Sequence, residues 1–160
     1  MPTYEPASPR DDLSQLHRLE AAVSDAFNSK DVDALMAVYA SGKALFVFDV
    51  MGPPGSYLSW DAYREALQHF FESISGPLHY TMSDLEIEAS GDVAYSRSLQ
   101  HLSGVHTKNG IPFDYTVRVT DVYRKFDSEW LIVQEHVSLP LARGSFSPLL
   151  HSSLLNANQS

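Results

Sequence analysis

The chain has 160 residues, of which 44% are hydrophobic, a length and composition that suit one globular domain with a substantial core. Its net charge of −9 argues against nucleic acid and anionic membrane surfaces as partners, and no apolar run approaches the length of a membrane span. The absence of cysteine excludes disulfides and thiolate chemistry and fits the reducing cytoplasm, where we expect the protein to reside.

The first half of the chain has helical periodicity. Residues 1–11 begin with a proline-rich run and are expected to form a flexible arm. Apolar residues at helical spacing predict a helix from about residue 12 to 28: Leu13, Leu16, Leu19, Val23, Ala26 and Phe27. Asp31 is typical of the N-cap of a short second helix, Val32 to Tyr39. Ser59 predicts the N-cap of a third, whose apolar stripe reaches Ile74 before Gly76-Pro77.

Strand patterns dominate the second half. A first strand is expected in ALFVFDV, residues 44–50, before the turn MGPPG. Period-two alternation then predicts four long strands, at 79–89, 93–103, 113–126 and 130–139, the last two forming a hairpin. Helices followed by an antiparallel meander indicate the α+β class, in one domain over residues 12–140. Residues 141–160 are expected to be a tail in which Ser147-Pro148 could start a short helix.

Three segments carry a resemblance to a known family: KDVDALMAVYA, GDVAYSRSLQHLSG and RVTDVYRKFDSEWLIVQEHVSLP. Over residues 12–140 the chain resembles the SnoaL-like, or ketosteroid isomerase-like, proteins of the NTF2-like superfamily. The resemblance implies a cone, in which a curved antiparallel sheet wraps around three N-terminal helices and leaves an internal pocket. It does not fix a function, because isomerases, cyclases, dehydratases and non-catalytic modules share this fold.

Asp49 is the first candidate catalytic residue. In the steroid isomerases that this chain resembles, a carboxylate after the first strand is the general base, and Asp49 matches that position. Its apolar neighbours in LFVFDVMG would raise its pKa toward neutrality. Asp49 could equally cap the MGPPG turn through its side chain. Val23 stands where those isomerases carry an oxyanion-holding tyrosine, so authentic steroid isomerisation is not expected.

His136 is the second candidate catalytic residue. It shares a strand parity with Ile132, so it would face inward with Ile132 unless a bulge intervenes. A neutral imidazole there could act as a base or hold a ligand oxygen, or it could be a hydrogen-bonded core histidine. Arg118, on the partner strand, could bind a carboxylate or enolate, or pair with Glu135 as a structural bridge.

Other polar and aromatic side chains are predicted to contact a ligand. With Arg118 they are Tyr39, Trp60, Tyr63, His101, Thr120, Gln134 and Ser138. The aromatic members could instead be core, and parity does not decide whether His101 faces the pocket or a dimer interface. The histidines lack metal-ligand spacing, so we expect neither metal nor cofactor.

These residues favour a cofactor-free enzyme of the isomerase, cyclase or dehydratase type that moves a proton next to a carbonyl. The expected ligand is small, and apolar or carbonyl- or carboxylate-containing. The alternative is a non-catalytic ligand-binding or assembly module with the same pocket.

Apolar residues occur on both parities of the strand 113–126, and helices can cover only one face of a sheet. We therefore expect a homodimer through the outer face.

Overall fold

The computed structural model describes residues 9–51, 55–144 and 147. Three α-helices are present in this part of the chain: α1 (Pro9–Ser29), α2 (Val32–Met36) and α3 (Trp60–Glu72), with a 3-10 turn, η1 (Gly42–Ala44), after α2. None of the described helices is long and apolar enough to cross a membrane.

The strands form a single six-stranded sheet in the order β2-β1-β6-β5-β4-β3. Four strands are long, β3 (Ile74–Ser90), β4 (Val93–His106), β5 (Pro112–Phe126) and β6 (Glu129–Ser138), and they form an antiparallel meander. β1 (Phe46–Phe48) extends the sheet by pairing parallel to β6, and β2 (Ser56–Tyr57) pairs antiparallel to β1. The predicted α+β class and long-stranded meander are confirmed.

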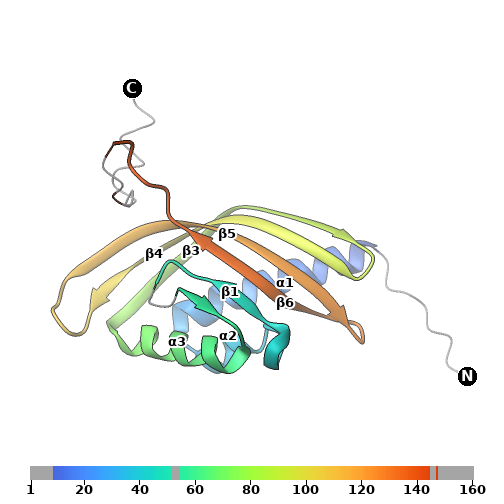
Figure 1. The fold of residues 1–160 in the computed structure, drawn as a ribbon, viewed down its shortest axis with the longest axis horizontal. Helices are drawn as coiled ribbons and strands as arrows, with labels where there is room; N and C mark the ends of the chain where they lie inside the picture. Colours follow the sequence, from blue (N-terminus) through green and yellow to red (C-terminus); the bar gives the residue numbers. More distant parts are fainter. Residues whose placement is uncertain (1–8, 52–54, 145–146, 148–160) are drawn as a thin grey trace, which may run out of the picture.

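The sheet is curved, and its concave face covers the helices. Figure 1 shows the long strands arching over α1, with α2 and α3 beneath the other end of the sheet. The core fills the space between them, and its largest fully buried side chains include Tyr123, Leu16, Leu35, Met36, Leu45 and Leu78. On β5 the odd-numbered residues from Val117 to Tyr123 are buried, so this strand presents one parity to the helices.

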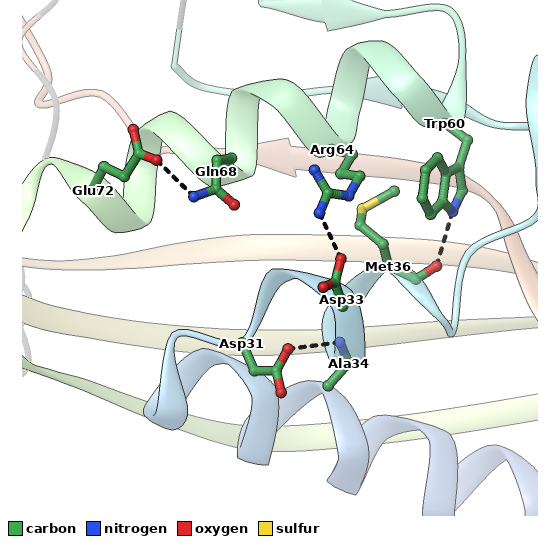
Figure 2. Close-up of polar contacts among 8 residues, drawn as sticks. All are labelled: Asp31, Asp33, Ala34, Met36, Trp60, Arg64, Gln68 and Glu72. Carbon is green, nitrogen blue, oxygen red and sulfur yellow. Dashed lines mark hydrogen bonds and ion pairs between the residues drawn. The ribbon is translucent and has the colours of Figure 1, made fainter.

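Local chemistry sets the starts of two helices. The Asp31 side chain accepts from the Ala34 N–H at 2.9 Å, and the Ser59 hydroxyl accepts from the Ala62 N–H at 3.3 Å, as expected for N-caps. Arg64 of α3 pairs with Asp33 of α2 at 2.6 Å, which ties the two helices together (Figure 2).

Several boundaries differ from the sequence prediction. α1 begins at Pro9, within the expected arm, and α2 ends at Met36 rather than Tyr39. β1 is only three residues long, and β2 was not predicted. Ile74 opens β3 instead of closing α3, because Gly76-Pro77 lies in an irregular stretch of the β3–β4 pairing rather than at a helix end. The expected helix after Ser147 lies outside the described residues.

Candidate functional site

A cleft of about 580 Å³ lies between α1, α3, the β1–β2 connection and the concave face of the sheet. This volume is in the range of sites that hold small molecules. Most of its wall is apolar or aromatic, and the described residues that form this part are Val23, Phe27, Val50, Met51, Tyr57, Ala62, Ala66, Leu67, Phe70, Leu102, Tyr115, Val117 and Val137. The polar groups in the wall are few, so their positions decide what the cleft can do.

Asp49 follows β1 and lines the cleft, as the sequence led us to expect. Its Oδ1 accepts from the Met51 N–H at 3.1 Å, so the same carboxyl also caps the turn. Burial raises the pKa of Asp49, against the lowering effect of the Met51 and Val50 backbone N–H groups. Asp49 therefore caps the turn and also borders the cleft, and its catalytic role stays a prediction.

Glu135 is the second carboxyl in the cleft wall, and two tyrosine hydroxyls hold it. The Tyr63 hydroxyl donates to Oε1 at 2.6 Å and the Tyr39 hydroxyl to Oε2 at 2.7 Å. Asp121 lies opposite Glu135 on β5, and burial together with the Glu135 charge raises the pKa of Asp121 well above its ordinary value. Burial also raises the pKa of Glu135, and the nearby Asp49 charge adds to this effect.

A third buried carboxyl, Glu20 of α1, lies in the adjoining core. It accepts a short hydrogen bond from the Tyr123 hydroxyl, which lies 2.7 Å from Ser96 Oγ. Burial raises the pKa of Glu20 to about 7, with a further contribution from Glu135. Glu20, Asp121 and Glu135 form no ion pair with lysine, arginine or histidine among the described residues.

Two tyrosine hydroxyls and an amide complete the polar lining. Tyr57 of β2 and Tyr115 of β5 line the cleft, and neither hydroxyl bonds to another described residue. Burial raises the pKa of Tyr115 to about 12 and also raises that of Tyr57, and the Asp49 charge contributes to both shifts. Gln100 of β4 lines the same cavity and makes one long hydrogen bond, to Ser98 at 3.4 Å. These groups are neutral donors available to a ligand.

The predicted aromatic contacts are in different places. Tyr63 lines the cleft, whereas Tyr39 supports Glu135 from behind the wall. Trp60 is directed away from the cleft toward α2, where its indole N–H donates to the Met36 carbonyl at 2.9 Å (Figure 2). Trp60 is thus part of the α2–α3 contact and not of the cleft lining.

The expected inward placement of His136 is wrong. Val122 pairs with Gln134 and Tyr123 with Ile132, so Val133 is an extra residue that reverses the parity of β6. Glu135 consequently faces the core. His136 is exposed on the outer face, across from Thr120 and 5.5 Å from the Phe48 ring.

The other polar candidates of the sheet share that outer face. Arg118 and Thr120 lie on the exposed parity of β5, and Gln134 is exposed on β6. The Arg118 Nε–H donates to Ser138 Oγ at 3.2 Å, so the alternative pairing with Glu135 does not occur. His101 Nε2 lies 2.9 Å from Asp114 Oδ1 on the same face. None of these residues lines the cleft.

The sequence held a signal for two of the buried carboxyls that were missed. Asp121 shares its parity with Val117, Val119 and Tyr123, and Glu20 lies one helical turn from Leu16 and Val23. Both positions therefore indicated buried carboxyls. Glu135 had no such signal, because only the bulge at Val133 turns it inward. No group of three or more potential metal ligands occurs among the described residues.

The sequence matches a known family, and the fold matches several solved structures. The model of the SnoaL-like domain matches residues 17–142. An NTF2-like protein of unknown function from Pseudomonas putida KT2440 aligns with a TM-score of 0.78 and 20% identity over 91% of this chain and 98% of that one. An NTF2-like superfamily protein from Salmonella enterica serovar Typhimurium LT2 aligns with a TM-score of 0.76 and 16% identity, over 86% and 97%.

A ketosteroid isomerase-like protein from Erwinia carotovora atroseptica SCRI1043 aligns with a TM-score of 0.67 and 19% identity, over 80% of this chain and 95% of that one. At these identities the solved structures establish the fold. No curated protein matches the chain.

Proposed function

This chain belongs to the SnoaL-like domain family, and from that premise we propose that its cleft binds a small carbonyl compound and that Asp49 removes a proton from the adjacent carbon. The observation that carries the proposal is the Asp49 carboxyl, fixed by the turn at the wall of an apolar cleft, where burial raises its pKa. A carboxylate with a raised pKa is a stronger base. It becomes protonated, and so loses its ability to accept a proton, at a higher pH than an ordinary carboxylate.

The neutral donors of the cleft supply the second requirement of this chemistry. Removing the proton moves negative charge from Asp49 to the carbonyl oxygen, which needs hydrogen-bond donors to stabilise it. The hydroxyls of Tyr57 and Tyr115 are in the cleft and have no described partner. They take the role that the sequence analysis gave to Arg118. An isomerase, cyclase or dehydratase of the cofactor-free type would use these parts, and one similar structure is named ketosteroid isomerase-like.

The experiment is proton exchange on a ketone that binds. A thermal-shift screen of aryl and cyclic ketones, beginning with acetophenone, identifies a binder, and NMR follows its loss of α-deuterium in the presence of enzyme. Asp49→Asn preserves the acceptor for the Met51 N–H, so the fold and the ligand's thermal shift should be retained. Exchange should fall by about 10²–10⁴-fold, the usual contribution of a positioned base.

Asp25→Asn is the matched control, because Asp25 is exposed on α1 and does not line the cleft. Equal exchange rates for wild type and Asp49→Asn would overturn the role of Asp49.

The second candidate function is a non-catalytic binding module. The turn-capping bond of Asp49 favours it, because that bond alone is a sufficient reason for an aspartate at this position. Binding of ketones by the wild type without any exchange would support that module.

A further inference from the structure

The ligand class of the cleft can be inferred from its charges. Three acidic residues line it, Asp49, Glu65 and Glu135, and no lysine or arginine does so among the described residues. His69 is the one basic type in that lining, and it is exposed on α3 together with Glu65. The chain as a whole carries a net charge of −9, which attracts cations and repels anions during the approach of a ligand.

Glu135 is a buried carboxyl that pairs with no lysine, arginine or histidine in the part of the chain that the structure describes. Its side chain is fixed from behind by the Tyr39 and Tyr63 hydroxyls, which favour its charged form against the burial that raises its pKa. Glu135 is 6% exposed, and an apolar ligand that fills the cleft would cover this remaining surface without offering the carboxylate a donor. A buried charge left in this way is costly unless the incoming group is a cation or a strong donor.

The aromatic side chains that line the cleft also favour a cationic ligand. Phe27, Tyr57, Tyr63, Phe70 and Tyr115 line the cavity, and the Tyr57 and Tyr63 rings have centroids 5.5 Å apart. Aromatic faces attract an ammonium group through their quadrupole, most strongly where water is excluded. Rings and carboxylates in one cavity are a typical combination for the recognition of amines.

We propose that the cleft is selective for compounds that carry a positively charged amine on a small apolar or aromatic body, with Glu135 as the anchor for the ammonium group. The inference rests on the proposed function in that it names the substrate class of the same cleft. The carbonyl substrate would then bring its own positive charge, which offsets the negative charge that develops on its oxygen near the Tyr57 and Tyr115 hydroxyls. The cleft lining described above offers no lysine or arginine for that role.

The test compares three probes of nearly equal shape: phenethylamine, phenethyl alcohol and phenylacetate. Binding is measured by isothermal titration calorimetry at physiological ionic strength on the full chain. Phenethylamine should bind at least about tenfold more tightly than the alcohol, given the size of charge-assisted and cation–π contacts. Phenylacetate should bind more weakly than the alcohol because of the cleft carboxyls. An alcohol that binds as tightly as the amine, or an acid that binds more tightly, would overturn the proposal.

Two variants assign the preference to a residue. Glu135→Gln keeps the size of the side chain and removes its charge, and it should cut phenethylamine affinity about tenfold or more while leaving the alcohol unchanged. Glu129→Gln makes the same charge change at an exposed residue of β6 outside the cleft, and it should leave both affinities unchanged. Equal losses in the two variants would mean that net charge alone attracts the amine, and would overturn the role of Glu135.

If Glu135→Gln does not fold, the three probes on the wild type still decide the selectivity. The result is separable from that of the proposed function, because no turnover is measured. Amine-selective binding without α-proton exchange would refute only the catalytic role of Asp49. Exchange of a neutral ketone without amine selectivity would refute only the ligand class.

Discussion

At the scale of single residues, the three carboxyls in and beside the cleft differ in their surroundings. Asp49, Glu135 and Glu20 all have a raised pKa through burial, yet their surroundings differ. Asp49 borders the cleft and is held by backbone N–H groups, Glu135 is held by two hydroxyls, and Glu20 lies in the core beside Tyr123. From these environments we propose proton transfer for Asp49 and ligand anchoring for Glu135, whereas Glu20 contributes to the core.

Glu20 should make the protein less stable as the pH rises. Its folded-state pKa of about 7 lies above its ordinary value of 4.5, so the folded state binds the proton more tightly. The contribution is complete below about pH 4.5, is lost as the pH rises to about 7, and amounts to about 3 kcal/mol. Raised pKa values at Asp49, Asp121 and Glu135 act in the same direction.

Melting temperatures at about pH 5 and about pH 8 measure this dependence. Wild type should melt at a lower temperature at the higher pH. Glu20→Gln should reduce the difference, since the amide resembles the protonated acid and still accepts from Tyr123. Glu129→Gln, at an exposed position, should leave it unchanged. A Glu20→Gln profile identical to that of wild type would contradict the assignment.

The tyrosines around Glu135 permit a paired test. Tyr63→Phe removes one donor from a buried carboxylate and should lower the free energy of unfolding by about 1–3 kcal/mol. Tyr57→Phe removes a hydroxyl that has no described partner, so stability should change by less than about 0.5 kcal/mol while ketone exchange slows. Urea unfolding gives both stabilities. Equal losses in the two variants would show that the Glu135 contact does not stabilise the fold.

At the scale of elements, caps were predictable and the register of β6 was not. Asp31 and Ser59 act on residues three positions away, so the sequence alone predicts them. The extra residue Val133 depends on pairing with β5 and on the core behind it, which a local pattern does not contain. One bulge therefore put Glu135 in the core in place of His136, and it turned the predicted β6 residues Gln134 and His136 to the outer face.

The cap of α3 bears on the cleft as well as on stability. Ser59→Ala leaves the Ala62 N–H without its acceptor and should cost about 0.5–2 kcal/mol in urea unfolding. Ligand binding should weaken too, because Tyr63, Ala66 and Phe70 of this helix form a wall of the cleft. Ser14→Ala, at an exposed position in α1, is the control and should have little effect. A cap variant as stable as wild type would refute the role of Ser59.

At the scale of the whole molecule, the two faces of the sheet have different compositions. The concave face carries the core and the cleft. The outer face exposes large apolar side chains, including Val93, Tyr95, Leu99 and Phe126, beside Arg118 and His136. Arg118 and His136, which were predicted to line a pocket, thus lie on this outer face instead.

We expect this outer face to form a homodimer. Tyr95 and Leu99 of β4 are 46% and 38% exposed, which is unfavourable for apolar side chains left in water. Leu99→Glu should shift the chain from dimer to monomer in sedimentation velocity at micromolar concentration while leaving the cleft intact. Ser14→Glu, at an exposed position of α1 away from the outer face, is the control. A wild-type monomer at the same concentration would contradict the dimer.

The central claim is that chemistry belongs to the cleft and not to the outer face. The measurement that tests it most directly is α-deuterium exchange of one bound ketone by wild type, Asp49→Asn and His136→Gln under the same conditions. Asp49→Asn should lower the rate by about 10²–10⁴-fold, and His136→Gln should change it by less than about twofold. Loss of exchange in His136→Gln with full exchange in Asp49→Asn would contradict the claim and place the reaction on the outer face.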